Sequence, residues 1–293
     1  MMAQTRTEKL PDGRVMAYDT LGPEDGEPLF LFHSLFGCRL MPPIAGPAAE
    51  RAGIRLISPD RPGLGRSDFL PGRTVLGWAK DVTDLADLLG IDRFRVFGVS
   101  AGSPYVMASC LGSPDRVIRA AIVSGLTPID EAGVVHRIVP RAIDPLLKKS
   151  LRMSRIAHAF IIKGMTKAPD RAMASLNKTL PRVDQDCVSK PEVAKFIIDG
   201  AIEAARPGLL GWAYDDKILN EPWGFSPRDL PAGIPIDLWW GDEDTSIPLE
   251  HGRQLAAQLP NATMNVVAGA GHFGIGLEGI DAVFAKILLP VTD

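Results

Sequence analysis

The stretch Phe94-Arg-Val-Phe-Gly98-Val-Ser100-Ala-Gly102 joins a run of strand character to a run of helical character almost without a connection. β-branched and aromatic residues lead up to Ser100, and helix-compatible residues fill positions 105–111. A chain that turns from strand to helix within one residue needs a strained backbone at Ser100, and Cβ atoms at Gly98 and Gly102 would collide across the corner. The stretch therefore predicts a strand, a sharp turn and a helix, with the Ser100 hydroxyl at the tip.

A serine held in this way is suited to nucleophilic chemistry. The backbone N–H of Ala101 would lie at the start of the following helix, where amides lack intrahelical partners and can stabilise an oxyanion. The nucleophile and half of an oxyanion hole would then come from one short segment. A G-x-S-x-G pattern alone is a weak signal, so the alternative at this point is a tight structural turn with an idle serine.

Outward from this stretch, short apolar runs alternate with segments of helical spacing. Strands are expected at 5–10, 14–19, 28–32, 54–58, 94–99 and 117–123, and helices at 44–52, 78–89 and 105–111. The turn signal Pro11-Asp-Gly13 makes the first two strands an antiparallel hairpin at one sheet edge. The alternation that follows predicts a doubly wound α/β fold, with a mostly parallel sheet covered by helices on both faces.

The alternation stops for about a hundred residues after Ser124 and resumes with strands at 234–240 and 262–268 and helices at 249–259 and 277–288. We therefore expect an α/β core of residues 1–129 and 222–293 with eight strands, and a helical cap of residues 130–221 inserted after the sixth strand.

The first part of the expected cap is strongly basic. Residues 131–171 carry nine Lys and Arg side chains against three Asp and Glu. Solvated outer helix faces are the preferred interpretation of this bias. Attraction of anionic substrates or of a membrane surface is the alternative.

Composition excludes several classes of protein. A net charge of −3 argues against a general nucleic-acid-binding role. The three cysteines are widely spaced and suggest neither a disulfide framework nor a zinc site. The polar N-terminus has no apolar signal segment, and no apolar run approaches the length of a membrane span. A cytoplasmic protein without metal or cofactor is expected.

Two further strand ends carry chemistry. Gly241-Asp-Glu-Asp244 follows the strand at 234–240, and Gly271-His272-Phe273 follows the strand at 262–268. The carboxyl ends of parallel strands meet at one edge of a sheet, so these loops should lie near Ser100. A serine hydroxyl needs an adjacent base, and that base needs an orienting carboxylate. The chain supplies the three groups in the order Ser, Asp, His.

With these residues in place, the chain resembles the α/β-hydrolase fold superfamily, in particular its lid-bearing, serine-esterase-like members. The resemblance implies Ser100 as nucleophile, Asp244 as the triad acid and His272 as the base. It implies a mainly structural role for the loop at 60–68, whose sequence is Asp-Arg-Pro-Gly-Leu-Gly-Arg-Ser-Asp.

The segment His33-Ser34-Leu35-Phe36-Gly37 stands where the family usually has His-Gly-x-x-Gly. The resemblance implies that the Leu35 amide is the second oxyanion donor beside Ala101. Ser34 replaces the usual glycine, and its hydroxyl could contact substrate.

Alternatives remain open at several positions. Asp242 and Glu243 are rival acids, and in some family members the acid follows the strand before the cap, which here would be Asp130. Tyr105 either lines the substrate pocket or packs inside the protein. The expected substrate contacts are Ser34, Phe36, Tyr105 and Phe273. The remaining histidines, at positions 33, 136, 158 and 251, are expected to be structural or solvated.

The resulting functional hypothesis is a hydrolase for carboxylic esters of small to medium, moderately apolar molecules, acting through an acyl-enzyme. The same triad could instead act on a C–C bond, a lactone or an amide, or in perhydrolysis. A receptor that captures a small molecule under the cap with little turnover is the non-enzymatic alternative. The sequence indicates no oligomeric state.

Overall fold

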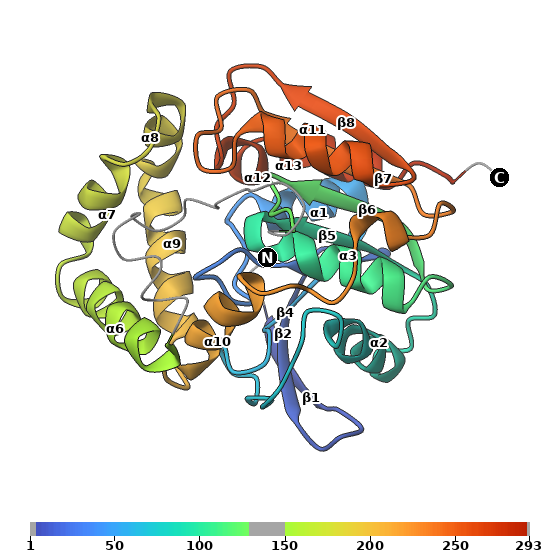
Figure 1. Cartoon of the computed structure of the whole chain (residues 1–293), viewed down its shortest axis with the longest axis horizontal. Coiled ribbons are helices and arrows are strands. Elements are labelled where there is room, and N and C mark those ends of the chain that lie inside the picture. The colour runs from blue at the N-terminus through green and yellow to red at the C-terminus, as the bar shows by residue number, and fades with distance from the viewer. Residues whose placement is uncertain (1–3, 129–149, 292–293) are drawn as a thin grey trace.

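The computed structural model of the chain describes residues 4–128 and 150–291. An eight-stranded sheet forms its centre (Figure 1). In spatial order the strands are β1 (Gln4–Lys9), β2 (Val15–Leu21), β4 (Ile54–Pro59), β3 (Glu27–Phe32), β5 (Phe94–Val99), β6 (Val117–Val123), β7 (Ile236–Gly241) and β8 (Ala262–Val267). The β1–β2 and β2–β4 pairs are antiparallel and the others are parallel. The predicted fold class is confirmed, and each strand lies within two residues of its expected bounds.

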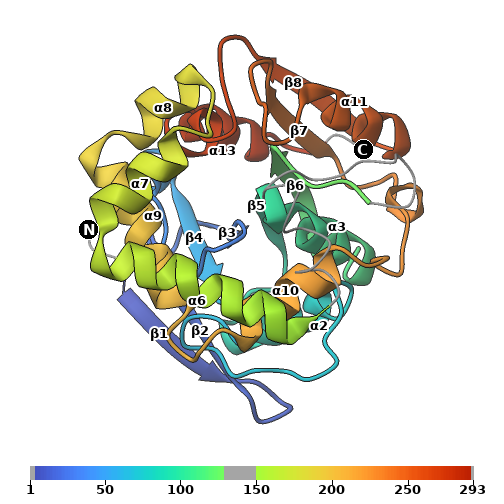
Figure 2. The same ribbon diagram turned by 60° about the vertical axis from the view of Figure 1, so that its left-hand side comes forward.

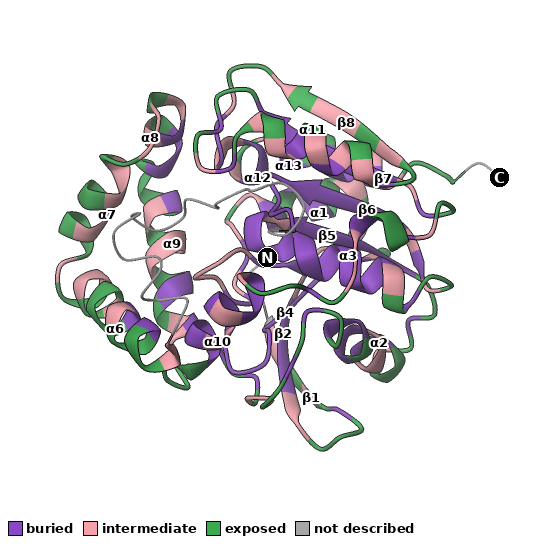
Figure 3. Cartoon of the chain, viewed as in Figure 1, coloured by how far each residue is buried: buried purple, intermediate pink, exposed green. Residues whose placement is uncertain are grey.

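Helices cover both faces of the sheet because the central strands are apolar on both sides. In β3, Leu29 and Leu31 belong to one buried cluster and Phe30 and Phe32 to another, as the alternation of side chains along a strand requires. The first cluster includes residues of α1 (Ala45–Ala52) and α13 (Ile280–Ile287). The second includes residues of α2 (Trp78–Leu88), α3 (Ser103–Gly112) and α11 (Leu249–Gln258). Figure 3 shows the resulting buried centre.

Between β6 and β7 the described residues form helices only, as predicted for the cap. They are α6 (Leu151–Lys167), α7 (Pro169–Asn177), α8 (Arg182–Val188), α9 (Pro191–Ala204), α10 (Leu210–Leu219) and the short 3₁₀ turn η2 (Pro227–Asp229). Helices α6 to α9 are grouped on one side of the core (Figures 1 and 2). Positions 130 and 136, named above, lie outside the described residues.

Buried and partly buried ion pairs join these helices to loops that follow the carboxyl ends of core strands. On α10, Asp215 lies 2.8 Å from Arg61 and 2.6 Å from Arg73. On α9, Glu203 lies 2.7 Å from Arg39. The helices after β6 are therefore placed over the end of the sheet that also carries the predicted catalytic loops.

Candidate active site

The turn after β5 has the strained geometry that its sequence predicts. Ser100 has φ of 53°, in the left-handed region, and starts the 3₁₀ turn η1 (Ser100–Gly102) that leads into α3. A Cβ atom on Gly98 would lie 2.6 Å from the Val106 side chain, and one on Gly102 would lie 2.2 Å from the carbonyl oxygen of Phe32. Both glycines are therefore required, and the backbone strain fixes a serine that is almost fully buried.

Three side chains from separate strand ends meet in one hydrogen-bonded chain. Nδ1 of His272 lies 2.9 Å from Oδ2 of Asp244, and its Nε2 lies 3.2 Å from Oγ of Ser100. A carboxylate only accepts, so Nδ1 carries the proton and Nε2 is left to accept the proton of the serine hydroxyl. The other oxygen of Asp244 accepts the backbone N–H groups of Ser246 and Ile247, which fixes the carboxylate in the turn after β7.

The rival acids do not reach the histidine. Asp242 and Glu243 are exposed, and Asp242 instead accepts the backbone N–H of Gly269 at 2.7 Å. Among the described carboxylates, the partner of His272 Nδ1 is Asp244.

The loop after β3 holds the Ser34–Leu35 peptide group in one orientation. The carbonyl oxygen of Ser34 accepts hydrogen bonds from His33 Nδ1 at 3.0 Å, the backbone N–H of Gly37 at 3.3 Å and Arg61 Nη2 at 3.1 Å. In a trans peptide the N–H points away from the preceding carbonyl, so the N–H of Leu35 faces opposite to these three donors. Within the described parts of the chain, no hydrogen bond uses the backbone N–H of Leu35 or that of Ala101.

A buried charge cluster lies behind this loop. Burial by itself would raise the pKa of Asp215. The guanidinium groups of Arg61 and Arg73 have the larger opposite effect and lower the pKa to about 2. Burial, followed by the charge of Arg61, holds the pKa of His33 well below its usual range, so that imidazole is neutral. Its Nε2 accepts the backbone N–H of Arg61 at 3.4 Å. Arg61 is therefore held in place by Asp215 while it donates to the Ser34 carbonyl.

Tyr105, one of the expected substrate contacts, is packed inside the protein. Its side chain is 1 % exposed, and its hydroxyl donates to Asp215 at 3.3 Å. Its ring packs against Trp78 and beneath the Arg61 guanidinium. One turn into α3, the helical repeat directs this side chain back toward the core, so the packing interpretation holds.

The other three expected contacts, Ser34, Phe36 and Phe273, are half-buried. Phe36 has φ of 60°, and its ring makes edge contacts with two aromatic side chains of the helical insertion, His158 and Trp212. The Phe273 ring packs edge-on against His272.

The remaining described histidines are held within the protein. His158 is buried with its Nε2 3.2 Å from Asp216, and burial lowers its pKa to about 4. His251 is half-buried on α11, and its pKa is also lowered by burial. Both locations agree with a structural role.

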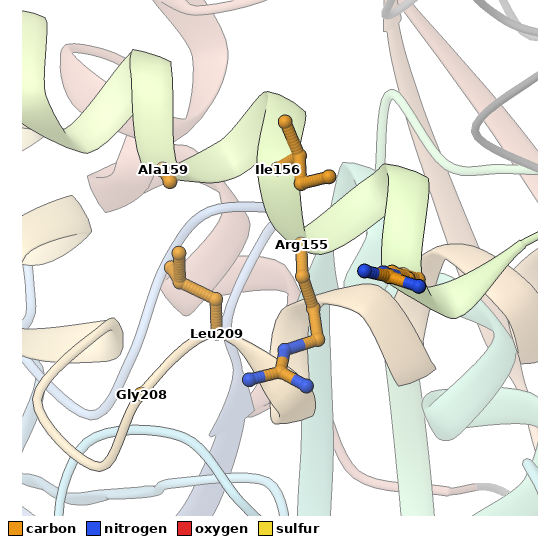
Figure 4. Close-up of a pocket in the computed structure, with 6 residues that line it drawn as sticks. Arg155, Ile156, Ala159, Gly208 and Leu209 are labelled. Atoms are coloured by element: carbon orange, nitrogen blue, oxygen red, sulfur yellow. The ribbon is translucent and has the colours of Figure 1, made fainter.

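Part of the basic segment borders an open groove of about 570 Å³ on the helical insertion (Figure 4). The groove is lined by Arg152, Arg155, Ile156, Ala159, Gly208 and Leu209. In the close-up, Arg155 extends from α6 toward the loop that holds Gly208 and Leu209. None of the helices in the described ranges is long and apolar enough to cross a membrane.

Comparison with known protein families identifies the family of the chain. Residues 27–278, most of the chain, match the family model described as alpha/beta hydrolase fold. The chain belongs to the α/β hydrolase fold family.

Individual relatives of this α/β hydrolase are distant. An uncharacterized protein of Mycobacterium tuberculosis is 25% identical over 74% of the chain, and the match spans 62% of that protein's length. The 2-hydroxy-6-oxononadienedioate/2-hydroxy-6-oxononatrienedioate hydrolase of Paraburkholderia xenovorans is 27% identical over 76% of the chain and 71% of its own length. The enol-lactonase structure from Burkholderia xenovorans superposes with a TM-score of 0.71 at 20% identity, covering 97% of this chain and 98% of that one. The last comparison shows the fold; the family and the names of its members support a hydrolase.

Asp184 on α8 is a residue at the site that sequence patterns do not reveal. Its carboxylate oxygens accept the backbone N–H groups of His272 at 2.9 Å and of Phe273 at 2.8 Å. The surrounding segment, Arg182-Val-Asp-Gln-Asp-Cys-Val188, has no motif that separates this aspartate from the neighbouring Asp186. Its contact with the histidine loop spans 88 residues and is visible only in the folded chain.

Proposed function

We propose that this α/β hydrolase cleaves carboxylic esters of small to medium, moderately apolar molecules through an acyl-enzyme on Ser100. The observation that carries the proposal is the hydrogen-bonded chain from Asp244 through His272 to Ser100, with the serine held at a strained strand-to-helix turn. We assign residues 1–129 and 222–293 to the core and 130–221 to a cap that closes the substrate space above Ser100.

In the first half of the reaction, Oγ of Ser100 attacks the acyl carbon while Nε2 of His272 accepts the hydroxyl proton. Asp244 keeps Nδ1 of the imidazole protonated and stabilises the imidazolium that forms. The N–H groups of Leu35 and Ala101 donate to the oxyanion of the tetrahedral intermediate. The C–O bond of the ester then breaks, and the alcohol leaves with the proton from Nε2.

In the second half, Nε2 removes a proton from water, which attacks the acyl-enzyme carbon. The same two amides hold the second oxyanion. Collapse of this intermediate breaks the bond to Oγ, returns the proton to Ser100 and releases the carboxylic acid. The buried pairs of Arg61 with Asp215 support both halves, because Arg61 helps to keep the Ser34–Leu35 peptide in the donating orientation.

Hydrolysis of a C–C bond is the second candidate function. Its support is the relative from Paraburkholderia xenovorans, whose name gives a 2-hydroxy-6-oxo-dienedioate as substrate. The same nucleophile, base and oxyanion donors would serve, but the leaving group is carbon and has to be protonated at carbon. The name of the enol-lactonase, by contrast, points to a cyclic ester and supports the first candidate.

The test is reaction of the purified protein with a small fluorophosphonate, followed by intact mass, beside a Ser100→Ala control. We expect one label per chain in the wild type and none in the variant, because only an activated serine attacks phosphorus at a useful rate. Turnover of a p-nitrophenyl ester is then compared with that of a 2-hydroxy-6-oxo-dienoate. An unlabelled wild-type protein would refute the proposal, and faster turnover of the dienoate would favour the C–C hydrolase. Tight ligand binding that survives in Ser100→Ala, without turnover in the wild type, would instead favour a receptor.

A further inference from the structure

The loop that carries His272 is attached to a helix of the cap through a buried carboxylate. Asp184 on α8 is fully buried, and it uses each oxygen for one of two consecutive backbone N–H groups, those of His272 and Phe273. The short helix α12 (Gly274–Leu277) begins directly after these residues and packs against α8. Asp184 therefore holds the backbone of His272 directly, through the N–H group of His272 itself.

The core side of this contact is shaped to receive the carboxylate. A Cβ atom on Gly271 would lie 2.4 Å from the Asp184 carboxylate. The glycine before His272 is therefore needed for the cap aspartate to approach, although its backbone angles do not require glycine. Gly271 is therefore required by the contact with Asp184 of the cap, and not by the conformation of its own loop.

The chemistry of the contact calls for a carboxylate. Burial raises the pKa of Asp184, and the two backbone N–H groups oppose this rise by stabilising the charged form. The titratable groups that face it are His272 and Asp244 in the core and Cys187 on its own helix. An amide in its place would offer one acceptor oxygen and one NH₂ donor, so one of the two backbone N–H groups would face a donor.

We propose that Asp184 is a positioning residue, which holds His272 so that its Nδ1 meets Asp244 and its Nε2 meets Ser100, and which makes the triad depend on a docked α8. The inference rests on the proposed function, because it assigns to His272 the role of the base. Positioning matters at this point, since the imidazole must reach two partners at once, 2.9 Å and 3.2 Å away. Displacement of a reacting group by about 1 Å costs up to ~100-fold in rate.

The decisive variant is Asp184→Asn, with Asp186→Asn as a control for charge on the same helix, because Asp186 is exposed. We expect Asp184→Asn to lower kcat and the rate of fluorophosphonate labelling by ~10- to 100-fold, with KM for a small ester nearly unchanged. The acid limb of the pH–rate profile should move to lower pH, because a nearby negative charge favours the imidazolium form. Asp186→Asn should match the wild type in all of these measurements.

A merely structural role for Asp184 is tested with Val188→Ala on the same helix. Val188 is buried in the cluster that also contains Phe273, so its truncation removes apolar contacts of α8 while α8 stays docked through both hydrogen bonds of Asp184 to the histidine loop. We expect Val188→Ala to lower Tm while the labelling rate and the pH profile stay close to those of the wild type. Equal kinetic losses in Val188→Ala and Asp184→Asn at equal Tm would overturn the proposal, as would wild-type labelling of Asp184→Asn.

Two further measurements test the proposal without depending on expression of the Asp184→Asn variant alone or on turnover of an ester. Gly271→Ala pushes the carboxylate away from the core side, so it should reproduce the losses of Asp184→Asn, and the double variant should lose little more than either single one. The downfield proton NMR signal of His272 Nδ1–H reports its bond to Asp244 without substrate. This signal should shift or vanish in both single variants, and an unchanged signal would contradict the positioning role even if no ester were turned over.

Discussion

Replacement of Asp215 by Asn should destabilise the protein strongly at neutral pH and less at acid pH. The Asp215 carboxylate is 1 % exposed and pairs with Arg61 at 2.8 Å and with Arg73 at 2.6 Å. The amide would leave two buried guanidinium groups without an anion. Loss of one partner from a buried pair costs about 3–5 kcal/mol, so we expect a loss of that size in the free energy of unfolding at pH 7.

The pH dependence has a definite sign. The folded-state pKa of Asp215 is about 2, below the ordinary value of 3.8, so its contribution is fully present above about pH 4 and is lost as the pH falls through 2. A difference of nearly two pKa units corresponds to about 2 kcal/mol, of which about 1 kcal/mol disappears between pH 5 and pH 3. Asn does not titrate, so the gap between wild type and variant should shrink by that amount.

The assay is urea unfolding at pH 7, 5 and 3, followed by tryptophan fluorescence, with Asp186→Asn as the exposed control. The reasoning would be refuted if the gap between wild type and Asp215→Asn stayed constant from pH 5 to pH 3. A kinetic result should accompany the loss of stability. Arg61 also donates to the Ser34 carbonyl, so kcat should fall more than KM rises.

Three further perturbations test other parts of the structure. Gly102→Ala would bring a Cβ atom within 2.2 Å of the Phe32 carbonyl oxygen. We expect the free energy of unfolding in urea to fall by about 1–3 kcal/mol and fluorophosphonate labelling to be lost. A labelled, fully stable variant would contradict the geometry of the turn at Ser100. Asp244→Asn should lower kcat by ~10⁴-fold, as expected when the base loses its orienting carboxylate, whereas Asp242→Asn should leave ester turnover unchanged; the reverse result would reassign the acid. Burial raises the pKa of all three cysteine thiols, so a disulfide reagent should modify none in the native protein and all three in guanidinium chloride; rapid reaction of the native protein would show that a thiol is accessible.

The sheet could be predicted from sequence because its strands carry their own signals. The run from Pro28 to Phe32 is apolar at every position, as a strand buried on both faces must be, and helical spacing flanks the central strands. The elbow at Ser100 could be predicted for the same local reason. Two glycines and a serine within five residues are enough to predict nearly all of the backbone geometry of this turn.

Other features depend on contacts that local patterns do not contain. The position of Tyr105 on α3 is compatible with a pocket or with packing, and only its bond to Asp215, 110 residues away, decides for packing. The helices after β6 show the same limit. Their spacing predicts helices, but not that Asp184 reaches the histidine loop or that Asp215 lies between two arginines. These contacts depend on how the insertion docks, which is a property of the whole fold.

Three of the described contacts between cap and core place a carboxylate on the cap. Asp184, Glu203 and Asp215, on three different cap helices, accept hydrogen bonds from guanidinium or backbone N–H groups of the core, and Asp215 also accepts the Tyr105 hydroxyl. Buried ion pairs add little net stability compared with apolar packing, but a displaced partner is costly, so they restrict how the two surfaces can slide. Asp215 binds Arg61, which in turn donates to the carbonyl of the Ser34–Leu35 peptide. Asp184 accepts the backbone N–H of His272 directly. Two of these contacts therefore lie next to the groups that we propose as oxyanion donor and base. If the proposed function is correct, a change in how the cap docks should alter the rate of the reaction as well as access to Ser100.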